Sequence, residues 1–97
     1  MQVAAYQAPL LPSGSTEIAL RLIRERVDEC ARRGIEMLCC PEGILGGLAD
    51  YAPRPREIAI PAEGGALEAL LEPLASDAVA TIVGYTEIDG QGRLFNA

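Results

Sequence analysis

Two short apolar segments on either side of a long amphipathic segment constrain the fold more than any other feature of this chain. Residues 3–8 and 35–40 are mostly apolar and each is followed by a proline, as expected for strands buried in a parallel sheet. Between them, apolar residues recur at helical spacing over residues 15–33, and Gly34 follows two arginines, which is typical of a helix end. A strand, helix and strand in this order form a right-handed parallel crossover, so the sequence predicts an α/β fold.

The rest of the chain predicts a long loop, a second helix and a hairpin. After Glu42 the regular pattern stops for about twenty residues that are rich in glycine and proline. A helix is expected to begin near Gly65 and to be interrupted at Pro73. Residues 78–88 read as one strand, and the turn signal that follows them predicts a hairpin with residues 93–97. All these strands are expected to share one sheet with apolar residues on both faces. Two helices cannot cover both faces, so we expect more chain or another subunit to cover the remainder.

The composition excludes most self-contained catalytic sets. The 97 residues contain no histidine and no lysine, which rules out within this chain a Ser-His-Asp triad, a Cys-His pair, a histidine metal site and a Schiff-base lysine. The formal net charge of -6 argues against a nucleic-acid partner, because such binding depends on clustered cations. The arginines of residues 21–33 alternate with acids at helical spacing and are expected to form ion pairs on a solvated helix face.

The cysteines predict a reducing, cytoplasmic setting. Cys30, Cys39 and Cys40 are odd in number, and adjacent strand residues point to opposite faces, so no disulfide framework is expected. Because apolar burial makes a thiol unreactive, Cys39 and Cys40 are interpreted as core residues and not as nucleophiles. The N-terminus lacks a basic segment of the signal-peptide type and no apolar run approaches membrane-spanning length, so no membrane partner is expected.

Glu42 is the strongest candidate for chemistry. It lies where the segment 35–40 ends, and the carboxyl end of a parallel strand is where open α/β sheets bind ligands. Its apolar neighbours, Ile44 and Leu45 among them, are expected to desolvate the carboxylate and direct it into a pocket. The alternative interpretation is that residues 41–43 form only an exposed turn. Elsewhere, Glu87 is expected to pair with Arg93 across the hairpin.

Several segments resemble parts of the carbon-nitrogen hydrolase, or nitrilase, superfamily. Residues 3–9 (VAAYQAP) look like the opening strand of that family, and residues 34–43 (GIEMLCCPEG) look like its strand leading into a Pro-Glu motif. GYTE at 84–87, followed by LFNA at 94–97, is similar to its hairpin. The resemblance extends over essentially the whole chain but only over the N-terminal part of a family domain. Residues 1–97 are therefore interpreted as a partial carbon-nitrogen hydrolase domain.

The resemblance implies a four-layer αββα sandwich and a catalytic set of glutamate, lysine and cysteine. Glu42 would be the general base that takes the proton from the cysteine thiol and later activates water, and a lysine would stabilise the tetrahedral anion. The lysine and the cysteine would lie beyond Ala97, so this chain alone is expected to be inactive. The implied substrate is a small amide or nitrile, with no cofactor and no metal, and a homo-oligomer is expected. Where the family commonly has Gly-Tyr after the motif, this chain has Gly47-Leu48.

Two functions from other classes remain open at the level of sequence. One is a truncated, non-catalytic α/β module that pairs its uncovered sheet with a second copy of itself. The other is a small ligand-binding domain that uses the glycine-rich loop at residues 43–47. This loop lacks the spacing of dinucleotide-binding and phosphate-binding loops, so its glycines are interpreted as turn residues.

Overall fold

The computed structural model describes residues 1–97 and has an α/β fold with two three-stranded sheets. The strands are β1 (Val3–Ala5), β2 (Met37–Cys39), β3 (Ile60–Pro61), β4 (Ala80–Ile82), β5 (Thr86–Ile88) and β6 (Leu94–Asn96). The α-helices are α1 (Thr16–Arg32), α2 (Pro55–Ile58) and α3 (Ala66–Leu71), and the 3₁₀ helices are η1 (Ala49–Tyr51) and η2 (Glu72–Leu74). The predicted α/β class is therefore confirmed.

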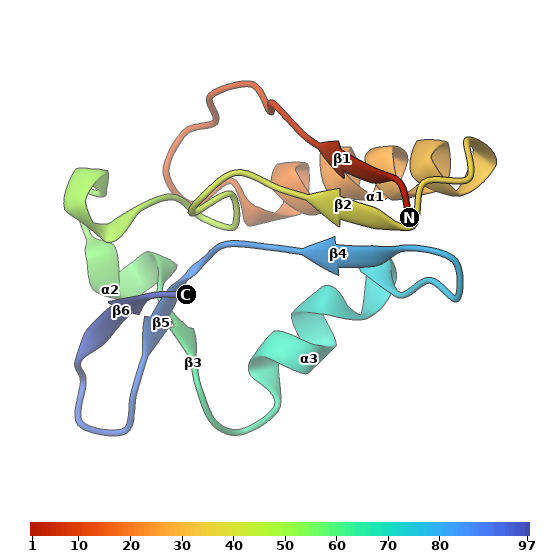
Figure 1. Ribbon diagram of the computed structural model, residues 1–97. Helices are drawn as coiled ribbons and strands as arrows, with labels where there is room; N and C mark the ends of the chain where they lie inside the picture. The colour runs from red at the N-terminus through yellow and green to blue at the C-terminus, as the bar shows by residue number, and fades with distance from the viewer.

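The first sheet contains the predicted strand–helix–strand unit. Its strands are parallel in the order β1-β2-β4, with β2 in the centre, and helix α1 joins β1 to β2 across one face (Figure 1). Helix α1 buries Ala19, Ile23, Val27 and Cys30, which recur at helical spacing along one side. This side packs against Leu38, the middle residue of β2, in the main hydrophobic core. The helix predicted from the amphipathic pattern of residues 15–33 is thus confirmed.

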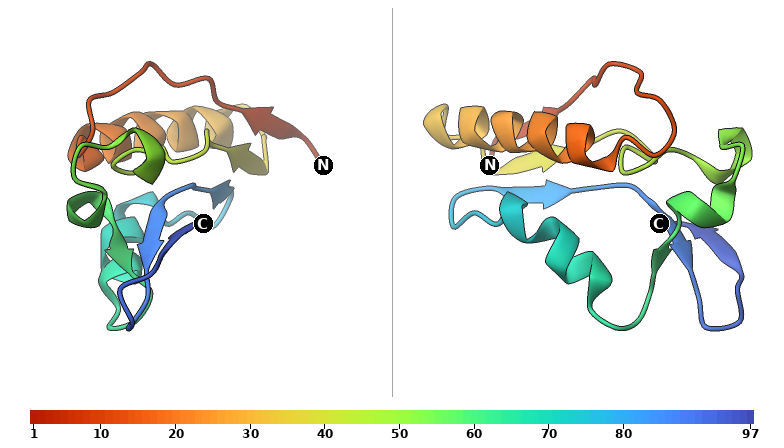
Figure 2. Two further views of the ribbon diagram at one scale, coloured as in Figure 1. Left: turned by 90° about the vertical axis from the view of Figure 1, so that its left-hand side faces the viewer. Right: turned by 180° about the vertical axis from the view of Figure 1, so that it is seen from behind.

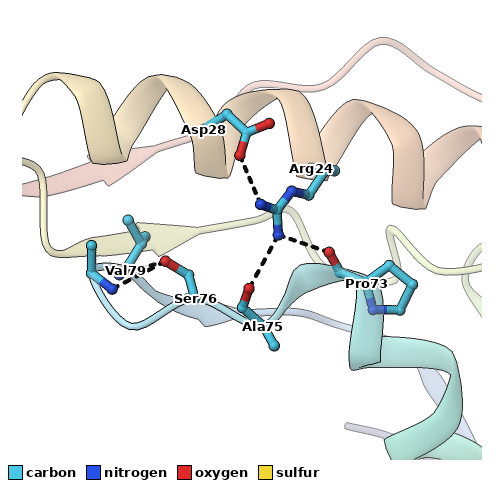
Figure 3. Close-up of polar contacts among 7 residues, drawn as sticks. Arg24, Asp28, Pro73, Ala75, Ser76 and Val79 are labelled. Carbon is cyan, nitrogen blue, oxygen red and sulfur yellow. Dashed lines mark hydrogen bonds and ion pairs between the residues drawn. The ribbon is translucent and has the colours of Figure 1, made fainter.

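Polar contacts on helix α1 connect it to η2. The Arg24 guanidinium is 2.9 Å from the Asp28 carboxylate, one of the ion pairs predicted for this helix face. Arg24 also donates hydrogen bonds to the carbonyl oxygens of Pro73, at 2.8 Å, and Ala75, at 3.1 Å (Figure 3). These contacts hold η2 on the same face of the first sheet as α1. Pro73 lies in η2, directly after α3, so the expected interruption of the second helix is confirmed.

The second sheet contains the predicted hairpin. Its order is β3-β5-β6, with β3 parallel and β6 antiparallel to β5, and the hairpin extends away from the first sheet (Figure 1). The Asp89 carboxylate closes the turn by accepting hydrogen bonds from the backbone N–H groups of Gln91 and Arg93. The segment expected to be one long loop after Glu42 holds η1, α2 and β3, so this expectation is wrong.

The prediction of a single strand over residues 78–88 is also wrong. Strand β4 belongs to the first sheet and β5 to the second, and the chain crosses between them at residues 83–85. At the crossing, Gly84 lies against the backbone of the Glu42 turn: an added Cβ would be 2.7 Å from the amide nitrogen of Gly43. The strands therefore form two sheets in place of the single sheet that we expected, and they meet beside Glu42.

One face of the first sheet is apolar and has no helix over it. Helix α1 lies on the opposite face, as the two views in Figure 2 show. Val3 and Ile82 on the uncovered face remain 56% and 55% exposed. The pairing register places six residues on this face: Val3, Met37, Ala80, Ala5, Cys39 and Ile82. The expectation that the first strand is buried on both faces is wrong, whereas the expectation of an uncovered apolar surface is confirmed.

Candidate functional site

Glu42 lies in a turn directly after the central strand of the first sheet. Strand β2 ends at Cys39, and Pro41, which has no backbone N–H, prevents the ladder from continuing. Gly43 then adopts a φ of 61°, a conformation that glycine takes without strain. A Cβ at Gly43 would also lie 2.7 Å from Cδ2 of Leu48. The sequence Pro-Glu-Gly thus places a carboxylate at the carboxyl end of β2, the position predicted from the sequence.

The backbone of this turn is held by the segments on either side of it. The backbone N–H of Gly47 donates to the carbonyl of Gly43 at 3.0 Å, which closes the glycine-rich loop. The N–H of Leu45 donates to the carbonyl of Gly84 at 3.1 Å, which ties the loop to the crossing between β4 and β5. The glycines of the loop have positive φ, so their interpretation as turn residues is confirmed.

The Glu42 carboxylate is hydrogen bonded to the second sheet. Its Oε1 atom accepts a hydrogen bond from Nδ2 of Asn96, in strand β6. Asn96 lies opposite Thr86 in the hairpin, and the Thr86 hydroxyl, which is buried, donates to the carbonyl of Gly47 at 3.2 Å. The hairpin therefore contacts both the glycine-rich loop and Glu42. Sequence reasoning missed Asn96; its only signal was an asparagine in a strand, where this residue is disfavoured.

The expected desolvation of Glu42 is wrong, because the residue is exposed. Its apolar neighbours along the chain pack into or against the core and do not enclose the carboxylate. Leu45 is completely buried in the main core, and Ile44 packs against that core. The Glu42 side chain is consequently open to solvent on one side and bonded to Asn96 on the other.

Two cavities adjoin at Glu42. The first has a volume of about 400 Å³ and lies between residues 8–15 and the loop 41–52. The second has a volume of about 470 Å³ and lies between η1 and strand β6. Glu42, Leu48 and Tyr51 line both cavities. Volumes of this size suit a small organic ligand, and the position between them gives the carboxylate access to a ligand in either one.

The cysteines lie outside both cavities, and all three are free. Burial raises the pKa of Cys40 to about 11, with smaller contributions from Cys39 and Cys30. The Cys40 thiol is therefore protonated at neutral pH and is a poor nucleophile. Cys39 lies on the uncovered face of the first sheet, so its interpretation as a core residue is wrong.

The expected pair between Glu87 and Arg93 is not formed. Arg93 makes an ion pair with Asp89 at 2.7 Å, within the hairpin turn. Glu87 lies opposite Phe95 in the register and accepts a hydrogen bond from the Tyr85 hydroxyl at 2.8 Å. Partial burial, followed by the contact with Glu87, raises the pKa of Tyr85. Neither Glu87 nor Tyr85 lines the cavities at Glu42.

Two further features of the chain concern metal binding and membrane spanning. No group of three or more histidine, cysteine, aspartate or glutamate side chains lies close enough together to hold a metal ion. None of the helices combines the length and the hydrophobicity needed to cross a bilayer.

Comparisons of the chain with protein-family models, curated proteins and solved structures found no match. The family resemblance therefore depends on the residues of the chain alone.

Proposed function

We propose that this chain is the N-terminal part of a hydrolase acting on carbon-nitrogen bonds other than peptide bonds, in amides or nitriles, with Glu42 as general base. The hydrogen bond between Asn96 and Glu42 is the observation that carries the proposal. It joins the Pro-Glu turn to the hairpin ending in LFNA, two of the segments on which the family resemblance rests, and it does so between two cavities.

The surroundings of Glu42 suit proton transfer. Its carboxylate takes part in none of the ion pairs of the structure, and the bond from Asn96 engages only Oε1. Oε2 has no hydrogen-bond donor from the chain and is free to accept a proton. A general base must lie within hydrogen-bond reach of the group that it deprotonates, and a fixed Oε1 limits the directions in which Oε2 can point. Asn96 is thus a positioning residue in this proposal.

The uncovered face of the first sheet supports the αββα arrangement as part of the proposal. Helix α1 lies on one side of the sheet (Figure 2), and the register places apolar residues on the other side. One half of a four-layer sandwich has this distribution, with the apolar surface facing a second sheet. The lysine and the nucleophilic cysteine of the mechanism would be supplied from beyond Ala97. The 97 residues by themselves are expected to release no ammonia from amides.

The coding DNA beyond codon 97 provides the first test. A lysine and a cysteine in the sequence context of the family, encoded in the same frame, support the proposal, whereas a stop codon at position 98 contradicts it. In the longer protein that includes the residues encoded beyond codon 97, Glu42→Gln is expected to lower kcat for ammonia release from a primary amide by about 10²- to 10⁴-fold. The control is Glu63→Gln, which changes an exposed carboxylate outside both cavities and should leave kcat unchanged. Equal kcat values for Glu42→Gln and Glu63→Gln would show that Glu42 is not the general base.

A second candidate function is a non-catalytic module that associates with a second copy. The uncovered face, with its exposed Val3 and Ile82, is the observation that favours it. Light scattering on the purified chain tests this function. A dimer that Ile82→Lys converts to a monomer supports it, and a monomer at all concentrations excludes it.

A further inference from the structure

Thr86 is the only buried residue of the chain with a polar side chain, and its hydroxyl has one hydrogen-bond partner. The residue is 2% exposed, and the hydroxyl donates to the carbonyl oxygen of Gly47 at 3.2 Å. A carbonyl oxygen can only accept, so the hydroxyl proton has to point at Gly47. A buried hydroxyl without a partner destabilises the fold, and the β-branched side chain of threonine has a restricted χ1. The contact therefore fixes the end of the glycine-rich loop against β5.

The pairing register places Thr86 beside Asn96. Tyr85 and Ala97 exchange both backbone hydrogen bonds, at 2.9 Å each, so the adjacent pair of Thr86 and Asn96 is a non-hydrogen-bonded pair. In a pair of this kind the two side chains lie on the same face of the sheet and come closest together. Both side chains consequently extend from the hairpin to the same loop, Thr86 at its end and Asn96 at its beginning.

These contacts close a ring through the glycine-rich loop. Thr86 holds Gly47, and the backbone N–H of Gly47 donates to the carbonyl oxygen of Gly43 at 3.0 Å. Gly43 follows Glu42 in the chain, and the Glu42 carboxylate accepts the bond from Asn96, the neighbour of Thr86. Removal of the Thr86 hydroxyl opens this ring and leaves the Asn96 amide as the only side-chain hydrogen bond between the hairpin and the loop.

We propose that Thr86 is a positioning residue for Glu42, because its hydroxyl holds the glycine-rich loop where the carboxylate meets Asn96. The inference rests on the proposed function, in which Glu42 is the general base. A displacement of about 1 Å at a reacting group can lower a rate by about 10²-fold, so a loosened loop should lower kcat. The fold should survive this loosening, because the backbone N–H of Leu45 still donates to the carbonyl of Gly84.

Two substitutions separate the hydroxyl of Thr86 from its methyl group. Thr86→Val keeps the shape of the side chain, and with it this wall of the second cavity, and removes the hydroxyl. Thr86→Ser keeps the hydroxyl. The readout is the pair of side-chain amide resonances of Asn96 in the isotope-labelled chain, and Glu42→Ala is the reference without an acceptor. Thr86→Val is expected to move these resonances toward their positions in Glu42→Ala, and Thr86→Ser to leave them near their original positions. Unchanged backbone resonances of Ile23 and Val27, in the core side of α1, show that a variant is folded.

A purely structural role for Thr86 predicts a different result. The two variants would then lower the urea midpoint without moving the Asn96 resonances, or would move them equally. Either result would overturn the inference and leave Glu42 standing as the proposed base.

The longer protein that includes the residues encoded beyond codon 97 provides the kinetic test. Thr86→Val is expected to lower kcat by about 10- to 100-fold with KM unchanged, and Thr86→Ser to retain most of kcat. Equal kcat values for these two variants would also overturn the positioning role. An unchanged kcat in Glu42→Gln would instead overturn the proposed function, and the Asn96 resonances of Thr86→Val distinguish the two failures because they do not depend on turnover.

Discussion

Replacement of Gly84 by alanine tests whether the crossing between the two sheets sets the position of Glu42. An added Cβ would lie 2.7 Å from the Gly43 nitrogen, 3.1 Å from Cα of Glu42 and 3.2 Å from the carbonyl oxygen of Pro41. All three are backbone atoms, which cannot rotate aside as a flexible side chain would. Either the turn or the crossing must therefore shift, and overpacking of this kind costs about 1–3 kcal/mol of the free energy of unfolding.

Urea unfolding followed by circular dichroism measures this cost. A loss near 2 kcal/mol, with a denaturant slope near 2 kcal/mol per molar, lowers the midpoint by about 1 M urea. Gly90→Ala is the matched control, because a Cβ at Gly90 has no atom within 4 Å. The Asn96 side-chain amide resonances should also move in Gly84→Ala, because the bond to Glu42 is disturbed, and should stay in place in the control. Coincident midpoints for the two variants, with unmoved Asn96 resonances, would refute the reasoning.

Three further predictions concern titration and the uncovered face. Burial raises the pKa of Cys40 from 9.0 to about 11, so the free energy of unfolding should fall as pH rises through this interval. In Cys40→Ala, urea unfolding should show a smaller fall over the same pH interval. The backbone and side chain of Arg93 lower the pKa of Asp89, so its stabilising contribution is present above the ordinary carboxyl range. The difference in free energy of unfolding between the original chain and Asp89→Asn should disappear as pH falls through the lowered pKa of Asp89. Ile82→Lys should change the free energy of unfolding by no more than about 0.5 kcal/mol, and a larger loss would mean that the face is covered in solution.

The parts of the fold that depend on local patterns could be predicted from the sequence. Helix α1 matches its expected bounds to within one residue because its apolar spacing, its ion pairs and Gly34 all act over short distances. The end of β2 and the location of Glu42 could be predicted because Pro41 has no backbone N–H with which a central strand could continue its ladder. The hairpin turn was identified from the residues at 89–92, which form it directly.

The predictions that were wrong concern features that depend on contacts between residues far apart in the sequence. The segments 80–82 and 86–88 have similar strand-forming composition, and the glycine between them, Gly84, indicates a bend or a close approach without indicating a change of sheet. The change becomes visible only through the approach of Gly84 to Gly43. Likewise, the burial of Leu45 in the core depends on contacts with distant segments, and the partner of the Glu42 carboxylate lies 54 residues away at Asn96.

The asparagine at position 96 is explained better by the Glu42 carboxylate than by the sheet. Asparagine is depleted in strands relative to β-branched residues, so threonine or valine would suit β6 better. The bond to Glu42 is exposed, and exposed polar contacts add little to stability. Neither strand propensity nor stability therefore favours asparagine here. Its amide does bind one oxygen of a carboxylate that lies between two cavities, and under the proposed function this contact would direct the other oxygen of the base toward the substrate.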